Sequence, residues 1–487
     1  MSIAFHTARR LPTNVDAIGV PVTTSGPVPR VLRISRAGLA DHGFEAKAGQ
    51  VLVLPAAGAR STLVAVGLGD ATEVSATTLR TAAAAFARAV AKRSTAATAL
   101  TEAAGVPAAE AARAVAEGIA LGTYRFTRFK GEQPDGGLTD VTLVGPNPAA
   151  LATGAQRGAA AAQAVCLARD LANTPPHHLN ALDFAEQART VATGRGLSVE
   201  VFEREQIEVL RLGGLLGVNR GSDQPPAVVK LTYTPPRPAG TVCLVGKGVM
   251  YDSGGISLKP SDGMHVMMKM DMTGAAVVLA VLSVLPILKP RVKVVGFCLC
   301  TDNMPSGRAL KLGDVLTIRN GKTVEIHNTD AEGRLLLADG LVLATEEQPD
   351  AIVDIATLTG AVLAALGKKL AGVMGNSDAW VDQLLASSRR TDEKLWHLPL
   401  PPEYRKLLDS NVADMKNIGG PYGGALTAGI FLQEFVDGVP WVHLDIAGVM
   451  DSDADEGWLS KGATGFGVRL LLDALAHFEP PAANGRG

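Results

Sequence analysis

Short apolar runs alternate with Ala-rich stretches over the first third of the chain. The runs at 31–34, 50–55, 62–67 and 140–145 are typical of β-strands. The Ala-rich stretches at 78–92 and 108–122 favour helices. The N-terminal part is therefore predicted to be an α/β domain.

A third Ala-rich stretch, at 149–173, predicts a long helix that ends before Pro175 and Pro176. We place the domain boundary on this helix. The predicted parts are an N-terminal α/β domain at 1–148, a linking helix at 149–173 and a C-terminal catalytic domain at 174–487. Few acids in the first domain lie beside other reactive groups, so we expect an assembly or regulatory role for it.

After Pro176 the chain alternates between strands, helices and Gly-rich turns, which predicts a mostly parallel sheet covered by helices. The candidate strands lie at 228–233, 241–245, 292–300, 323–327, 351–355 and 441–446. Sites in such sheets gather beyond the carboxyl ends of the strands. The fold class is thus α/β, with a smaller N-terminal and a larger C-terminal domain.

The segment Asn-Thr-Asp-Ala-Glu-Gly-Arg at 328–334 lies between a predicted strand and a long apolar run at 335–345. Capping of a helix start by Asn or Asp explains one acid. It does not explain Asp330, Glu332 and Arg334 together, because buried charges are costly without partners.

Two other segments carry charge at predicted strand or helix ends. Lys247, Asp252 and Lys259 follow the strand at 241–245, and Asp271 opens an apolar helix. The Gly-Lys pair at 246–247 resembles a phosphate loop, but Gly248 stands where that loop requires Ser or Thr. We therefore discount a nucleotide site.

Four carboxylates in one small, largely apolar site would repel one another and raise each other's pKa values. A pair of divalent cations bridged by these carboxylates would remove that repulsion and would activate water for hydrolysis. Carboxylate ligands without Cys or His fit Mg, Mn or Zn.

Composition narrows the class of protein. Of 487 residues, 47% are hydrophobic and 19% charged, and the net charge is −2, which indicates a globular protein without a broad basic field. The N-terminus lacks an apolar signal segment and no run is long and pure enough to span a membrane, so we expect a cytoplasmic protein. The four cysteines form no C-x-x-C pair and are predicted to be free thiols. His177, His178 and His265 are expected in surface loops.

The segments together resemble the leucyl aminopeptidase family of dinuclear-metal exopeptidases, which includes bacterial aminopeptidase A. NTDAEGR at 328–334 is similar to the family signature, and other blocks follow in the family's order: VGKGVMYDSGGISLKP at 245–260, DMTGAA at 271–276, NMPSG at 303–307 and ATLTGA at 356–361. The resemblance extends from about residue 173 to residue 478. It is weaker in the N-terminal domain, where 117–130 carries it.

The resemblance implies a set of metal ligands: Lys247, Asp252, Asp271, Asp330 and Glu332. It also implies that Lys259 polarises the peptide carbonyl and that Arg334 holds a bicarbonate acting as general base. Substrate contacts are implied at Asn328, Met268, Thr357, Leu358 and Gly360. The implied activity releases N-terminal residues such as Leu and Met from short peptides, using two Zn or Mn ions, with Mg and Co as further candidates. The implied assembly is a homohexamer built from two trimers.

One departure from the family pattern stands between Lys259 and Asp271, where this chain carries one residue more. It is expected to affect the floor of the substrate pocket and hence the side chain that the pocket prefers.

Two alternative functions remain open at this point. A two-metal phosphoester hydrolase would share the carboxylates but would not need a lysine ligand. An added DNA-binding role of the N-terminal domain is weakened by the balanced charge.

Overall fold

The computed structural model describes residues 3–54, 61–132 and 136–482. Contacts divide the chain into two compact units, Met1–Cys166 with Ser452–Lys461 and Leu167–Asp451 with Gly462–Gly487. The division falls within helix α4 (Pro148–Asn173), which covers the stretch predicted to link the domains. The N-terminal unit also takes in ten residues from near the end of the chain, a feature that the sequence pattern does not reveal.

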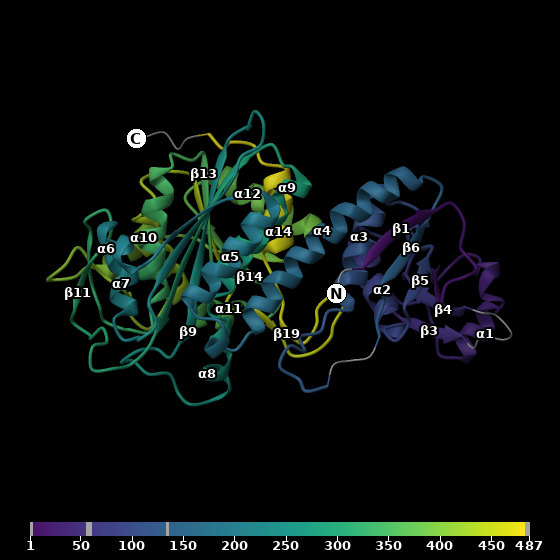
Figure 1. The fold of residues 1–487 in the computed structure, drawn as a ribbon, viewed down its shortest axis with the longest axis horizontal. Helices are drawn as coiled ribbons and strands as arrows, with labels where there is room; N and C mark the ends of the chain where they lie inside the picture. The colour runs from purple at the N-terminus through teal and green to yellow at the C-terminus, as the bar shows by residue number, and fades with distance from the viewer. Residues whose placement is uncertain (1–2, 55–60, 133–135, 483–487) are drawn as a thin grey trace. The chain divides into compact units, whose positions relative to one another are not determined.

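The N-terminal unit is built on a six-stranded sheet in the order β1-β6-β5-β2-β4-β3 (Figure 1). Its strands are β1 (Ala4–Ala8), β2 (Ala17–Val22), β3 (Val51–Leu54), β4 (Thr62–Gly67), β5 (Thr95–Thr98) and β6 (Asp140–Val144). Among the described strands of this unit, the β3–β4 pair is antiparallel and the other pairs are parallel. The helices are α1 (Arg36–Asp41), α2 (Ala76–Ala89) and α3 (Ala108–Gly122), with short 3-10 turns η1 (Arg30–Leu32) and η2 (Leu100–Glu102).

Ala-rich packing shapes this unit. Helices α2 and α3 lie against each other, and their alanines join a buried core with Phe86 and Leu79. The buried acid Glu117 of α3 pairs with buried Arg80 of α2 at 2.6 Å, which satisfies both charges inside the unit. The strand predicted at 31–34 is wrong: Arg30–Leu32 form a 3-10 turn, and Ser35 caps helix α1 directly afterwards. Position 55, the end of another predicted strand, lies outside the described residues.

The C-terminal unit contains an eight-stranded sheet in the order β15-β14-β17-β13-β9-β10-β8-β7. Its strands are β7 (Ser198–Phe202), β8 (Ala227–Tyr233), β9 (Thr241–Asp252), β10 (Lys293–Asn303), β13 (Ala351–Ala356), β14 (Ala371–Gly375), β15 (Leu395–His397) and β17 (Trp441–Asp445). The central strands β17, β13, β9 and β10 run parallel, and β8, β7 and β14 pair antiparallel with their inner neighbours. The predicted mostly parallel sheet is confirmed.

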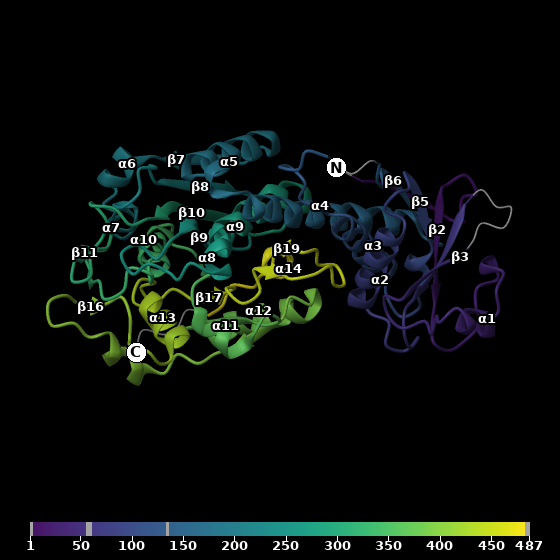
Figure 2. The same ribbon diagram turned by 90° about the horizontal axis from the view of Figure 1, so that it is seen from below.

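Helices cover both faces of this sheet (Figures 1 and 2). On one face lie α5 (Ala181–Arg195), α9 (Thr273–Leu288), α12 (Asp378–Thr391) and α14 (Val468–Ala476). On the other lie α7 (Gly213–Asn219), α10 (Gly333–Glu346) and α13 (Gly424–Gln433). The remaining short elements are α6 (Arg204–Val209), α8 (Gly263–Met267), α11 (Gly360–Leu366), η3 (Pro176–His178), η4 (Met268–Met270) and η5 (Pro402–Leu408).

The strand predicted at 323–327 forms, as β12 (Thr323–Glu325), but not in the large sheet. It pairs with β11 (Val315–Thr317) and β16 (Met415–Lys416) in a separate three-stranded sheet. A further two-stranded pair comprises β18 (Asp451–Ser452) and β19 (Gly462–Ala463). The acid-rich segment at 328–334 therefore approaches the large sheet from outside rather than from one of its strands.

The run Gly263–Leu288 meets the length and hydropathy of a membrane span, contrary to the expectation from sequence that no run would. In the structure 83% of its apolar window is buried within the protein. Helix α9 makes up most of this run and packs against β8, β9, β10 and β13. Its uniform apolarity thus reflects a position in the core of the C-terminal unit.

Candidate metal centre

The acidic residues singled out in the sequence meet at the carboxyl ends of the central strands. Lys247 lies within β9 and Asp252 ends it. Asp271 precedes helix α9, and Glu332 precedes helix α10. Neither Asn328 nor Asp330 caps α10: the N-cap position is Glu332, whose side chain makes no capping hydrogen bond. Capping therefore does not account for the acids in this segment.

Three carboxylates form the centre of the site. Asp252, Asp271 and Glu332 are all buried, and each offers an oxygen within 4.8 Å of the others. Lys247, also buried, places Nζ 2.9 Å from Asp271 Oδ2 and 2.7 Å from Glu332 Oε1. One ammonium group thus faces two carboxylates from segments far apart in the sequence.

Asp330 lies beside this group rather than within it. Its side chain is 33% exposed and joins the cluster through Lys259. Lys259 Nζ lies 2.5 Å from Asp330 Oδ1 and 2.7 Å from Asp252 Oδ2. The two lysines and four carboxylates therefore form one continuous charged network.

Burial and like charge raise the carboxylate pKa values in this network. The pKa of Glu332 is raised by burial and by Asp252, and that of Asp330 by the same two causes. Burial also raises the pKa of Asp271, although Lys247 opposes it. Burial would lower the pKa of Lys247, but the surrounding carboxylates outweigh burial and raise it. The same balance raises the pKa of Lys259. The site strongly favours positive charge among its acids.

Arg334, the last residue of the signature segment, is buried beside the cluster and hydrogen-bonds through one of its nitrogens. Its Nη1 donates to the carbonyl oxygen of Asn417 at 2.8 Å. Its Nε is buried and has no hydrogen-bond partner among the described residues. Burial lowers the pKa of Arg334 to about 10. The guanidinium stays charged near neutrality with at least one donor available to an anion.

Gly333, in the signature segment, packs directly against the side chain of Lys247. A Cβ there would lie 2.7 Å from both Nζ and Cε of Lys247. Any side chain would displace the lysine from the carboxylates. Glycine at 333 is therefore required by close approach, not by backbone conformation.

Sequence reasoning gave no role to several side chains that hold the site together. Asn303 donates from Nδ2 to Asp252 Oδ1 at 2.8 Å and to the carbonyl of Thr329 at 3.0 Å. Thr329 donates to the carbonyl of Gly254 at 2.7 Å. Asn417 accepts from the backbone N–H of His327 at 2.8 Å and donates to the carbonyl of Asn328 at 2.6 Å. Asn303 and Thr329 lie within blocks that carried the family resemblance, and Asn417 lies within the longer stretch over which it extends; this resemblance was the only available signal.

The predicted substrate contacts surround the cluster to different degrees. Thr357 is buried, accepts from Lys247 Nζ at its carbonyl oxygen at 2.8 Å, and donates its hydroxyl to Asp271 Oδ1 at 2.7 Å. Leu358 and Gly360 follow it, with Gly360 exposed at the start of α11. Asn328 accepts from the backbone N–H of Asp330 at 2.9 Å. Met268 is buried in η4, three residues before Asp271.

The histidines and cysteines behave as follows. His177 and His178 are exposed in η3, as expected. The expectation of a solvent-facing loop for His265 is wrong, because it lies in α8, stacks on Tyr251 and buries Nε2. All four cysteines are free, and Cys243, Cys298 and Cys300 are buried. None of these three contributes to the metal centre.

The residues present fit a pair of divalent cations. Asp271 Oδ2, Asp330 Oδ1 and Glu332 Oε1 are buried, and a lysine ammonium group lies 2.5–2.9 Å from each of them. Two ammonium groups leave the four carboxylates with excess negative charge, which is costly to bury unless further cations bind it. The donor set of carboxylates and one amine suits hard or borderline cations.

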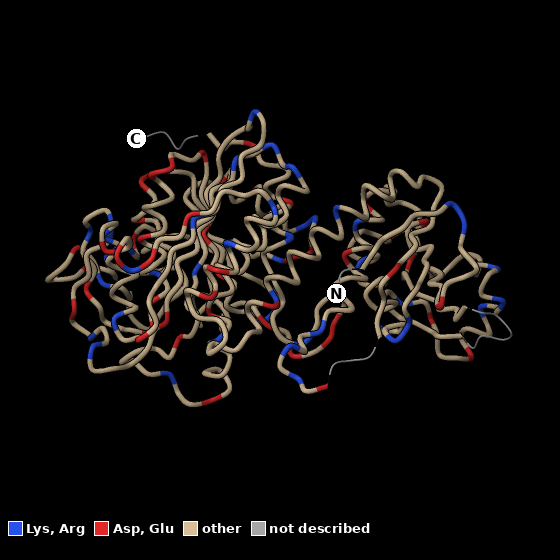
Figure 3. Tube along the Cα trace, in the orientation of Figure 1, with Lys and Arg blue, Asp and Glu red and all other residues tan. Residues whose placement is uncertain are grey.

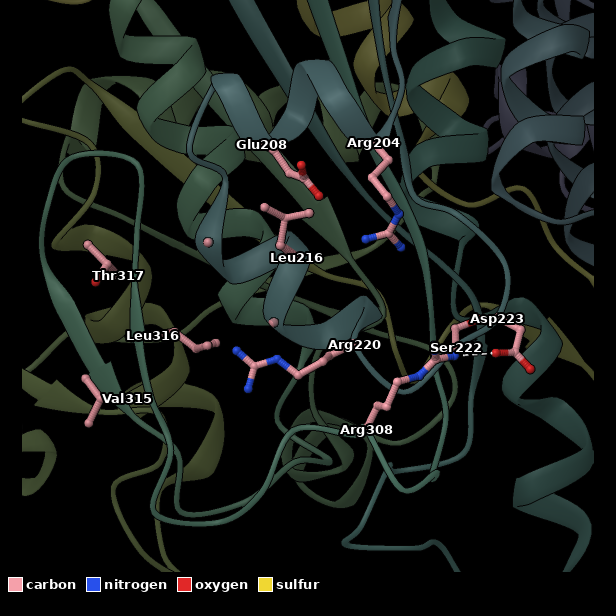
Figure 4. A pocket seen from close by; sticks show the side chains of 12 residues that line it. Arg204, Glu208, Leu216, Arg220, Ser222, Asp223, Arg308, Val315, Leu316 and Thr317 are labelled. Carbon is pink, nitrogen blue, oxygen red and sulfur yellow. Dashed lines mark hydrogen bonds and ion pairs between the residues drawn. The ribbon is translucent and has the colours of Figure 1, made fainter.

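A separate pocket of about 810 Å³ lies elsewhere in the C-terminal unit (Figure 4). Its lining includes Arg204, Arg220 and Arg308, each of which already contacts Asn219, Asp314 or Asp223. None of the clustered carboxylates lines it. The pocket is therefore distinct from the metal centre.

Comparison with known proteins decides the family. The model of the cytosol aminopeptidase family, catalytic domain, matches residues 166–472, and the model of that family's N-terminal domain matches residues 33–133. The chain belongs to the cytosol aminopeptidase family. It is a metal-dependent aminopeptidase, and the carboxylate cluster lies within the matched catalytic domain.

Curated relatives carry the same family name, and a solved structure shares the fold. A protein of Streptomyces avermitilis named "Probable cytosol aminopeptidase" is 42% identical, with 97% of each chain covered. One of Alkaliphilus metalliredigens with the same name is 43% identical over 77% of this chain and 76% of its own. The structure "Bottromycin maturation enzyme BotP in complex with Mn" superposes with a TM-score of 0.88 at 43% identity, covering 95% of this aminopeptidase and 99% of that chain.

Proposed function

We propose that Lys247, Asp252, Asp271, Asp330 and Glu332 hold two divalent cations, and that this aminopeptidase releases Leu, Met and similar residues from the N-termini of short peptides. The observation that carries the ligand assignment is the convergence of three buried carboxylates within 4.8 Å; Lys247 contacts two of them, and Lys259 contacts the third and Asp330. When bound, the cations supply Lewis-acid activation of water and of the scissile carbonyl.

The protein's own charged groups would bind and orient the substrate. Lys259 lies at the more exposed side of the cluster, where its ammonium group stabilises negative charge that develops on the peptide carbonyl oxygen. Lys247 is deeper and must be a neutral amine to act as a ligand, which requires a neighbouring dication to lower its pKa. Arg334 would hold a bicarbonate through its unpaired Nε–H, and that anion would serve as the general base.

Zn and Mn are the metals we favour, with Mg and Co as further candidates. The TM-score and identity of the Mn-containing relative support Mn. For the substrate pocket we propose Asn328, Met268, Thr357, Leu358 and Gly360, with the extra residue between Lys259 and Asp271 modifying its floor.

We further propose that the chain assembles as a homohexamer of two trimers in the cytoplasm, as the family resemblance implies. The N-terminal unit would serve assembly or regulation. Acidic and basic residues are interspersed along both units (Figure 3), so the alternative DNA-binding role gains no support from the charge distribution.

The test is hydrolysis of a panel of amino-acid anilides by Mn-loaded and by Zn-loaded protein. We expect Leu and Met substrates to be cleaved fastest, and a chelator to abolish cleavage until metal is restored. Cleavage of Leu-anilide by metal-free protein would contradict the proposal. Hydrolysis of a phosphodiester in place of Leu-anilide would instead support the phosphoester alternative.

A further inference from the structure

Asp445, a buried acid outside the proposed ligand set, accepts hydrogen bonds from the turn 357–359 beside the metal centre. Asp445 ends strand β17 and lies opposite Ala356, the last residue of β13, in the parallel register. It is fully buried. The turn 357–359 begins directly after Ala356, so Asp445 faces the start of that turn.

The carboxylate of Asp445 accepts hydrogen bonds from backbone and side-chain groups of this turn. Oδ1 accepts from the backbone N–H of Leu358 at 3.2 Å and of Thr359 at 3.4 Å. Oδ2 accepts from the Thr359 hydroxyl at 2.7 Å. Oδ1 also accepts from the N–H of Ala447 at 3.2 Å, which ties the acid to its own strand end. The pKa of Asp445 is raised, because the effect of burial outweighs the opposing effects of His443 and these donors.

The turn fixed in this way contacts two of the proposed ligands. Thr357 accepts from Lys247 Nζ at its carbonyl and donates its hydroxyl to Asp271 Oδ1. Among the described residues, Thr357 alone hydrogen-bonds to both of these side chains. The Thr359 hydroxyl also accepts from Val362 N–H at 3.0 Å, so the same residue anchors the start of α11.

We propose that Asp445 is a positioning residue for the metal centre. It holds the turn 357–359 so that Thr357 orients Lys247 and Asp271 for metal binding. Outer groups that orient ligands typically change metal affinity by about 10- to 100-fold when removed. The inference rests on the proposed ligand set.

The experiment measures Mn²⁺ affinity of the purified metal-free full chain by calorimetric titration, with melting temperature recorded for each variant. Asp445→Ala removes the acceptors and is expected to weaken Mn²⁺ binding about 10- to 100-fold. Asp445→Asn keeps an acceptor for the backbone N–H groups and is expected to restore most of the affinity. Thr359→Val removes only the hydroxyl, and Thr359→Ser retains it, so these two form a milder matched pair.

Asp354 supplies the structural control. It is equally buried, on the neighbouring strand β13, accepts from Trp441 Nε1 at 2.7 Å and pairs with His443 Nδ1 at 2.5 Å, and no hydrogen bond among the described residues joins it to the turn. Asp354→Ala should lower the melting temperature without weakening Mn²⁺ binding. The inference is overturned if folded Asp445→Ala and Thr359→Val bind Mn²⁺ as wild type does, or if Asp354→Ala weakens binding equally. Failure of the wild type itself to bind two Mn²⁺ would refute the proposed ligand set instead.

Discussion

Glu332 has both an attractive and a repulsive charged neighbour in the centre: its carboxylate pairs with Lys247 and is repelled by Asp252. We expect Glu332→Gln to bind fewer than two Mn²⁺ per chain and to lower kcat about 100-fold or more, the scale seen when one charge-stabilising group is removed. Removing a repelled buried charge should leave the melting temperature of the metal-free protein unchanged or higher. Metal content by elemental analysis and Leu-anilide kinetics check this.

Glu346 provides the control for that variant. It is a half-exposed acid on the same helix, α10, and pairs with Arg319 at 2.8 Å. Glu346→Gln should retain two metals and full activity. Equal loss of metal in both variants would show that α10 tolerates no change of charge, which would contradict a specific role for Glu332.

Asp339 gives a prediction about pH. It is fully buried on α10, accepts from the N–H groups of Leu215 and Arg319 at 2.9 Å each, and burial raises its pKa to about 7. Since the pKa in the folded state exceeds the ordinary value, the folded state binds a proton more tightly than the unfolded state. The contribution of Asp339 to the free energy of unfolding is fully present below about pH 4 and is lost as the pH rises to about 7.

Asp339→Asn should remove this pH dependence. The difference in melting temperature between wild type and variant is expected to change between about pH 4 and 7, favouring wild type most at the acidic end. In the variant, the amide NH₂ group cannot accept a hydrogen bond, so one of the two backbone N–H groups loses its partner. This loss should destabilise the variant by about 1–3 kcal/mol at every pH. A pH-independent difference would show that Asp339 titrates normally.

At the scale of elements, the packing of α9 against β9 and β13 sets where Asp271 lies. A Cβ on Gly274 would approach Ile355 O to 2.1 Å and Lys247 N to 2.8 Å. Gly274→Ala must therefore push the start of α9 away from the sheet. We expect a loss of about 1–3 kcal/mol or more, the range for overpacking, together with weaker Mn²⁺ binding. Gly307→Ala, where a Cβ meets nothing within 4 Å, should change neither melting temperature nor Mn²⁺ affinity.

Sequence patterns predicted one Ala-rich helix and several of the central strands well. Helix α3 has the predicted bounds, and β8, β13 and β17 lie within about a residue of theirs. Strands β1, β2, β5, β7, β14 and β15 were not predicted, because they are short or mixed in polarity and form through neighbours distant in sequence. The placement of β12 in a small separate sheet likewise depends on pairing that no local pattern encodes.

The candidate site was predictable where charge marked it and not where neutral or distant groups complete it. Asp252, Asp271 and Glu332 stood out as acids at element ends and do converge. Asn303, Asn417 and Asp445 act through hydrogen bonds to backbone or ligands that exist only once β10, β16 and β17 are in place. Their function is a property of the tertiary fold.

At the scale of the whole molecule, the two units bury separate cores. Among the described residues, a large cluster of buried side chains around β9, β10 and α10 lies wholly in the C-terminal unit, and clusters around β2, β4, α2 and α3 lie wholly in the N-terminal unit. All proposed metal ligands belong to the C-terminal unit. Metal binding should therefore stabilise one unit and leave the other unaffected, since a ligand stabilises only the folding equilibrium to which it is coupled.

Scanning calorimetry of the chelated protein should resolve two transitions, of which adding Mn²⁺ raises only one. At 100 times the dissociation constant the expected stabilisation is about 2.7 kcal/mol per independent site. The chelated C-terminal unit should still fold, because Lys247 and Lys259 neutralise part of the carboxylate charge. Asp271→Asn should abolish the shift and leave the second transition in place. A single transition that moves as a whole would show instead that the two units unfold together, and the metal would then stabilise the entire chain.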